Sequence, residues 1–214
     1  MSTESSQNVL TIPMELDISY DIQKIVFTGP LVEIVNGTLT SLDDTMLPPD
    51  VTEIRDYLFY NNSLLADVNL TNVMTVGQYA FSNCAIENLN MPNLFMAGPQ
   101  SFSYNPMTSV TLPNLMEAST QVFQRCDSLT TADFMILSRI GRLAFYYCEN
   151  LDTLILRSES VVQLDGAQQF SNTKIESGTG YIYVPDTLVS SYQADSAWAP
   201  YALQIRPISL LEVG

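Results

Sequence analysis

The sequence predicts a β-rich solenoid of short strands, with a β segment before the repeats and a helical and extended cap after them. Three observations predict this fold. Phenylalanine recurs every 21 or 22 residues, the same apolar pattern follows each phenylalanine, and both ends of the chain depart from that pattern. A unit this short cannot bury its apolar side alone, so successive units must stack against one another.

The repeat is marked by five phenylalanines that are 22, 21, 21 and 22 residues apart: Phe59, Phe81, Phe102, Phe123 and Phe145. An alternating apolar pair follows each of them: Val68/Leu70, Leu89/Met91, Val110/Leu112, Ala132/Phe134 and Leu154/Leu156. Alternation with a period of two is typical of a short strand with one face turned inward. We expect the strands to stack about 4.8 Å apart and the five rings to fill one column of the core.

Three residues after each phenylalanine, the chain carries Asn62, Cys84, Asn105, Cys126 or Cys148. A small side chain at this repeated position favours an inward-facing column that packs or hydrogen-bonds to the backbone. Two alternatives are less well supported. A Cys126–Cys148 disulfide would leave one thiol over, and a zinc site would lack both a C-x-x-C pair and a histidine.

We assign the repeats to residues 48–170. Residues 1–47 contain strand-like segments separated by Gly29-Pro30, Gly37 and Asp43-Asp44. They form an N-terminal β cap or attachment segment in this interpretation, and a divergent first coil remains an alternative. The sequence MLPPD at residues 46–50 marks the boundary, because consecutive prolines favour extended linkers.

Residues 171–214 are assigned to a C-terminal cap, because the last coil of a solenoid would otherwise expose an apolar surface. Residues 186–202 contain a short helical stretch with Tyr192, Trp198 and Tyr201. We expect these aromatic side chains to cover the last coil. Residues 205–208 then form a final extended piece.

The charge of the chain argues against several classes of partner. It has 8 Lys and Arg against 23 Asp and Glu, a formal net charge of −15. Nucleic acid and anionic membrane surfaces would repel it, and no segment has the roughly 20 apolar residues that span a bilayer. The chain has no histidine and no nucleotide-binding or nucleophile motif. We therefore expect no enzyme activity, no catalytic residues, no cofactor and no metal.

The repeat units resemble a known family. The segments VTEIRDYLFYNNSLLADVNL, VGQYAFSNCAIENLNMP and IGRLAFYYCENLDTLIL, followed by the tail YIYVPDTLVSSYQADSAWAPYALQIRPIS, are similar to the BspA-type leucine-rich repeat and its frequent C-terminal end. The resemblance covers roughly residues 48–209. It implies a right-handed leucine-rich-repeat coil, adhesion and protein–protein contact, and an extracellular or surface location in bacteria, their phages and some protists.

Side chains that alternate outward on the expected strands are the candidates for ligand contact, since polar residues there form a surface rich in donors and acceptors. A solvated face with no partner is the alternative. The candidates on the strands are Asp67, Asn69, Asn88, Asn90, Ser109, Thr111, Thr131, Asp133 and Thr153, with Ile155 in the same outward position. A second candidate patch comprises Tyr104, Tyr146 and Tyr147, because exposed tyrosines recur at interfaces.

These observations favour a structural or adhesive component of a bacteriophage virion, such as a tail, fibre or capsid-decoration protein. The beginning MSTESSQNVLTIP matches no secretory signal. The expected partners are a protein or glycan on a host surface or neighbouring virion proteins, and association into a homo-oligomer is also expected. The alternative is a bacterial cell-surface or secreted adhesin.

Overall fold

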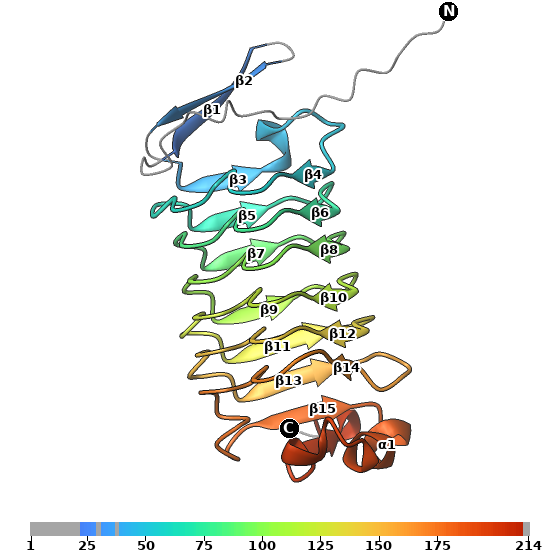
Figure 1. Cartoon of the computed structure of the whole chain (residues 1–214). Coiled ribbons are helices and arrows are strands. Elements are labelled where there is room, and N and C mark those ends of the chain that lie inside the picture. Colours follow the sequence, from blue (N-terminus) through green and yellow to red (C-terminus); the bar gives the residue numbers. More distant parts are fainter. Residues whose placement is uncertain (1–21, 29–30, 37–38, 212–214) are drawn as a thin grey trace, which may run out of the picture.

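The computed structural model describes residues 22–28, 31–36 and 39–211. Figure 1 shows a rod of stacked coils, with the strands lying across the long axis of the rod. A typical coil contains one longer strand, one shorter strand and one tight turn that carries the repeat phenylalanine. We call the three resulting sides the long-strand face, the short-strand face and the turn face. The expected β-solenoid is confirmed.

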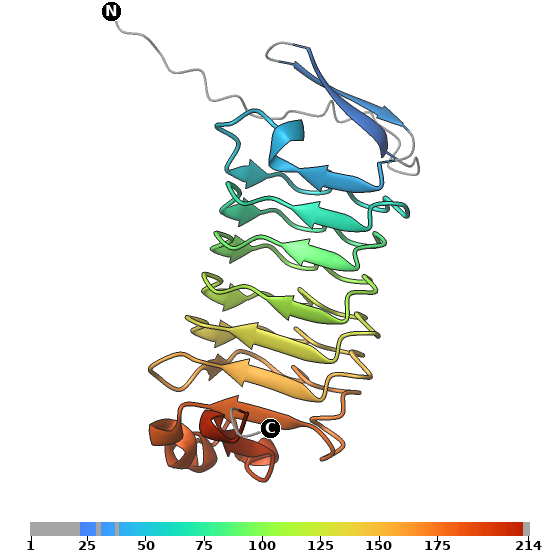
Figure 2. The same ribbon diagram turned by 180° about the vertical axis from the view of Figure 1, so that it is seen from behind.

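The long-strand face is formed by β3 (Ser41–Asp43), β5 (Asp67–Asn69), β7 (Asn88–Asn90), β9 (Ser109–Thr111), β11 (Thr131–Phe134), β13 (Thr153–Leu156), β15 (Tyr181–Val184) and β16 (Ile205–Pro207). The short-strand face is formed by β4 (Glu53–Ile54), β6 (Thr75–Val76), β8 (Met96–Ala97), β10 (Glu117–Ala118), β12 (Arg139–Ile140) and β14 (Gln163–Leu164). A 3₁₀ helix, η1 (Asp44–Met46), lies between β3 and β4. Figure 2 shows the same stack from behind.

The two strand faces differ in continuity. All six short strands form one parallel sheet in the order β14-β12-β10-β8-β6-β4. The long strands form two parallel sheets, β3-β5-β7 and β16-β15-β13-β11-β9, with no pairing between β7 and β9 in the described part of the chain. The coil stack is therefore closed on one side and interrupted at one point on the other.

The turn face is held together by main-chain hydrogen bonds between coils. The N–H groups of Phe59, Phe81 and Phe123 each donate to a carbonyl oxygen of the next coil, at 2.8, 2.8 and 2.9 Å. Two residues before and two residues after each of the five phenylalanines, and likewise around Phe170, the backbone adopts a positive φ, between 56° and 64° at these twelve non-glycine positions. Such a conformation costs about 1–3 kcal/mol per residue, and the bonds to the neighbouring coil offset that cost.

The phenylalanine column is confirmed, and it is longer than expected. All five rings are fully buried, and successive centroids are 5.1, 5.7, 5.9 and 5.5 Å apart. A sixth ring, Phe170, continues the stack at 5.8 Å from Phe145. The spacing of 25 residues hides it in the sequence. Of the three extra residues, two lie between β13 and β14 and one lies between β14 and Phe170, where Gly166 has a φ of +84°.

The inward-facing cysteine column is also confirmed. The thiols of Cys84, Cys126 and Cys148 donate to the carbonyl oxygens of Phe59, Phe102 and Phe123 in the preceding coils, at 3.1, 3.3 and 3.0 Å. All three cysteines are free and buried. Burial raises the pKa of the Cys84 and Cys126 thiols to about 12. They are structural donors rather than reactive nucleophiles.

The C-terminal segment packs against the last coils. It contains η2 (Asp186–Leu188), α1 (Val189–Ala194), η3 (Ala199–Tyr201) and η4 (Ile208–Leu211). Tyr192 and Trp198 are fully buried. The Trp198 indole N–H donates to the Val162 carbonyl at 2.7 Å, and the Tyr192 hydroxyl accepts from the Val162 N–H at 3.0 Å. Strand β16 adds the final extended piece to the ladder.

At the N-terminal end, β1 (Ile22–Thr28) and β2 (Leu31–Asn36) pair antiparallel with each other. The strand-like segment at residues 9–19 lies outside the described residues. Strand β3 pairs parallel with β5, and Leu42 is 1% exposed in the core. The ladder therefore begins before residue 48, and the MLPPD boundary at residues 46–50 falls inside the first coil. The role assigned to residues 1–47 stays a prediction.

Candidate functional site

The outward side chains of the long-strand face divide into an exposed group and a covered group. Asp67, Asn69, Asn88, Asn90, Ser109 and Thr111 are exposed, whereas Thr131, Asp133 and Thr153 are half-buried. The expectation that Ile155 faces solvent is wrong, since its exposure is 8%. Its register partners on both sides are Asp133 and the large Tyr183, whose strands flank it. The accessible polar surface lies in the first half of the solenoid.

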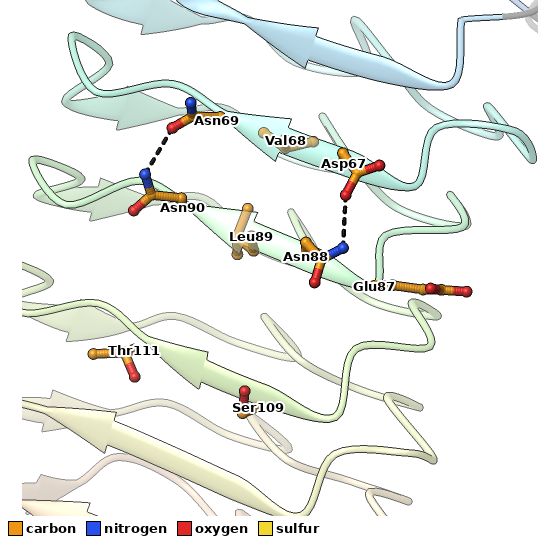
Figure 3. A pocket seen from close by; sticks show the side chains of 9 residues that line it. All are labelled: Asp67, Val68, Asn69, Glu87, Asn88, Leu89, Asn90, Ser109 and Thr111. Atoms are coloured by element: carbon orange, nitrogen blue, oxygen red, sulfur yellow. Dashed lines mark hydrogen bonds between the residues drawn. The ribbon is translucent and has the colours of Figure 1, made fainter.

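Side-chain amides connect neighbouring coils on this surface. The Asn88 amide N–H₂ donates to a carboxylate oxygen of Asp67 at 2.6 Å, and the Asn90 amide N–H₂ donates to the Asn69 amide oxygen at 2.6 Å (Figure 3). These bonds form because parallel strands in register place equivalent side chains directly above one another. The Asn88 and Asn90 amides are thus held in fixed orientations, and their oxygen atoms point toward β9.

A hollow of about 280 Å³ lies over β5, β7 and β9. Its lining is drawn in Figure 3 and comprises Asp67, Val68, Asn69, Glu87, Asn88, Leu89, Asn90, Ser109 and Thr111. This set combines two carboxylates, three amides, two hydroxyls and two apolar side chains, and it contains no cationic group. Such a surface offers hydrogen bonds in both directions and repels anions. We refer to it below as the strand-face hollow.

The tyrosine candidates follow the repeat phenylalanines on the turn face. Tyr146 and Tyr147 contact each other edge to face at 4.5 Å, and the Arg125 guanidinium lies 4.3 Å from the Tyr147 ring centroid. Tyr104 is 45% exposed and lies close enough to Tyr79 to influence its titration. Burial, and then the neighbouring tyrosines including Tyr104, raise the pKa of Tyr79.

Two further tyrosines complete the group around Tyr79. The Tyr57 ring stacks on Tyr79 at 5.0 Å, and Tyr60 contacts both edge to face at 5.9 and 6.0 Å. Sequence reasoning missed Tyr57 and Tyr79, although each stands two residues before a repeat phenylalanine. Comparing that position between units would have found the pair.

An exposed apolar column beside the short-strand face was also missed. Met74, Phe95, Met96 and Met116 are 50%, 39%, 54% and 39% exposed. The Phe95 N–H donates to the Met74 carbonyl at 2.8 Å, and the Met116 N–H donates to the Phe95 carbonyl at 3.2 Å, so these residues lie above one another. Met74, Phe95 and Met116 each precede a repeat phenylalanine by seven residues. Aligning the repeat units with one another would have revealed this apolar position.

Within residues 22–28, 31–36 and 39–211, no three His, Cys, Asp or Glu side chains form a group that could hold a metal ion. Over the same ranges, no helix has the length and apolarity to cross a bilayer.

A family model agrees with the repeat geometry. A family model described as a BspA type leucine rich repeat region matches residues 19–105 and 96–188, with 6 copies. A search of curated proteins finds no significant match. Among solved structures, the chain is similar to a leucine-rich repeat protein from Bacteroides ovatus ATCC 8483, with 18% identity and a TM-score of 0.48. The alignment covers 78% of this chain and 51% of that one, so this chain spans about half the length of its structural relative.

Proposed function

The chain belongs to the BspA-type leucine-rich repeat family, and from this premise we propose that it is a non-enzymatic adhesion module whose contact surface is the first half of the long-strand face. The family supports protein interaction and adhesion in general. The choice of surface rests on one observation, the strand-face hollow with its fixed amides. Fixed polar groups bind with a smaller loss of side-chain entropy than mobile ones.

The interior of the solenoid supports the same proposal. The phenylalanine and cysteine columns are buried and serve the stacking of coils. Functional contacts are thereby left to side chains that point outward. Exposed positions on a rigid repeat are the ones that relatives with the same core can vary without loss of the fold.

The proposal is tested with the purified chain on a panel of host-surface glycoproteins and oligosaccharides, measured by biolayer interferometry. Thr111→Arg places a long cation at the rim of the hollow and should weaken binding by roughly tenfold or more. Its matched control is Asn83→Arg on the exposed turn face. Equal affinity of the two variants for every bound panel member, or no bound member at all, would contradict the proposal.

As the finer assignment, we propose display on a bacteriophage particle, with a bacterial cell-surface or secreted adhesin as the second candidate. The acidic composition, poor in lysine and rich in uncharged polar residues, supports the particle, and the family supports the bacterial surface. Mass spectrometry of purified particles and of envelope and secreted fractions separates the two. Detection only in the bacterial fractions would rule out the particle.

A further inference from the structure

The coil stack opens at one place on one face. Strands β7 and β9 do not pair in the described structure, although their coils stay joined elsewhere. On the short-strand face, Met96 and Ala97 of β8 pair with β10. On the turn face, the Phe81 N–H donates to the Ser101 carbonyl at 2.8 Å, and the Asn83 N–H donates to the Ser103 carbonyl at 2.9 Å. The opening is local and does not separate the coils.

Pro106 stands just before the opening. One coil earlier, the Ala85 N–H donates to the Leu65 carbonyl at 3.1 Å. Pro106 occupies the equivalent position, four residues after its phenylalanine, and proline has no N–H to donate. The equivalent hydrogen bond is therefore missing between these two coils, and the strands part just after this position.

The opening interrupts the amide columns and uncovers an apolar floor. The amide nitrogens of Asn88 and Asn90 are bonded to β5, so their oxygens face the Ser109 and Thr111 side of the gap (Figure 3). Leu89 is only partly buried and packs against the core. Its equivalents in the adjacent coils, Val68 and Val110, are 1% exposed. The hollow therefore has acceptors on one wall, hydroxyls on the other and an apolar surface between them.

From this arrangement we propose that the strand-face hollow binds an uncharged sugar unit of a glycan. A sugar hydroxyl donates to an amide oxygen and accepts from a serine or threonine hydroxyl, which matches the two walls. The C–H surface of the ring packs on Leu89. The volume of about 280 Å³ lies near the lower end of ligand pockets, about 300 to 1,000 Å³, which suits one or two sugar units.

The charges of the lining select against other ligands. Asp67 and Glu87 border the hollow, and its lining contains no Lys or Arg. Phosphate, sulfate and sialic acid carboxylates would be repelled there. This inference rests on the proposed adhesive function and adds the chemical class of the ligand and the residues that recognise it.

The test uses the full chain on an array of neutral hexose and N-acetylhexosamine oligosaccharides, with sulfated and sialylated counterparts. Neutral oligosaccharides should bind, and their charged counterparts should not. Ser109→Ala and Thr111→Val each remove one hydroxyl and should weaken binding roughly tenfold. Thr131→Val, in the same column but outside the hollow, is the matched control and should bind as the unmodified chain does.

Pro106→Ala tests the cause of the opening. It restores an N–H, so the amides of residues 108 and 109 should exchange hydrogen more slowly and neutral oligosaccharides should bind at least roughly tenfold more weakly. Pro113→Ala in the same coil is the control and should change neither measurement. Unchanged glycan binding by Ser109→Ala and Thr111→Val, preference for anionic glycans, or no glycan binding overturns the sugar proposal.

The two proposals fail in different ways. If a peptide or protein binds and Thr111→Arg abolishes that binding while no oligosaccharide competes, the long-strand face is a protein contact surface and only the sugar assignment fails. If Thr111→Arg and Asn83→Arg bind every ligand equally, the contact surface itself is wrong.

Discussion

The coils of Phe81 and Phe102 meet differently on their two strand faces. On the short-strand face, β8 and β10 pair as part of a continuous six-stranded sheet, whereas on the long-strand face β7 and β9 stay apart. The same two coils also share ring stacking at 5.7 Å in the core. One side of a solenoid coil can thus open for function while the core and the other two sides keep it stacked.

The difference indicates where the stability of the stack resides. A typical coil contacts its neighbour through a buried aromatic column, a column of buried donors and backbone hydrogen bonds on up to three faces. If the interior columns supply most of the stabilising free energy, loss of one strand pairing is tolerated. Changes in the columns should then cost more than changes on the long-strand face.

The largest effect is expected for Phe102→Ala. The ring is fully buried between two others, and its removal leaves a cavity that should lower the free energy of unfolding by about 3–5 kcal/mol. Urea denaturation followed by circular dichroism measures it. Phe95→Ala, at a ring that is 39% exposed, is the control and should cost less than about 1 kcal/mol. Similar costs for both would show that the column is not the main support.

Asn105→Ala should have the next largest effect. The Asn105 amide donates to the carbonyls of Phe81 and Phe102 at 2.8 and 2.9 Å and accepts from the Ile86 N–H at 3.0 Å. Loss of these buried partners should cost about 1–3 kcal/mol. Asn105→Cys should recover part of it, because cysteine donates to the same carbonyl in other coils. An alanine variant as stable as the unmodified chain would contradict this role.

The cysteine column should make stability depend on alkaline pH. Burial raises the pKa of Cys126 from 9.0 to about 12, so the unfolded thiol ionises at a lower pH than the folded one. The unfolded state then binds fewer protons, and stability is lost as pH rises above about 9, by about 1.4 kcal/mol per pH unit for each such cysteine. Denaturation at pH 8, 9 and 10 measures the slope.

Cys126→Ala serves as the control for this slope. The substitution should remove the contribution of one thiol to the pH dependence of stability. The free energy of unfolding of the variant should therefore fall less steeply between pH 9 and 10. An identical slope in both proteins would show that the buried thiol is not the titrating group.

The smallest effect is expected for Arg157→Ala on the closed part of the long-strand face. Arg157 Nε and Nη2 each lie 2.9 Å from an Asp133 carboxylate oxygen, and the two side chains are 36% and 21% exposed. Solvent screening should limit the cost to about 1 kcal/mol, decreasing with salt. Arg139→Ala, whose partner Asp165 is 3.8 Å away and exposed, should cost less. If Arg157→Ala lowered the free energy of unfolding more than Asn105→Ala does, the long-strand face would contribute more stability than the buried column, contrary to this ranking.

The sequence predicted much of the core. A ring at a constant interval, a small donor three residues later and an alternating apolar pair recur along the chain, and the structure confirms them as columns and strands. The exposed positions Asp67, Asn69, Asn88 and Asn90 follow from the same alternation. Phe170 escaped because its spacing of 25 residues departs from the interval, and β3 escaped because its coil lacks the phenylalanine pattern.

The periodic pattern of the sequence by itself determined the fold class and the core positions, because each unit repeats the same local pattern of burial. Only the tertiary structure decided which equivalent positions differ. The opening at Pro106, the burial of Ile155 and the contact of Tyr57 with Tyr79 depend on what the coil above or below supplies to the same position. Those partners are about 21 to 28 residues away in the sequence, and they meet only once the register between coils is fixed.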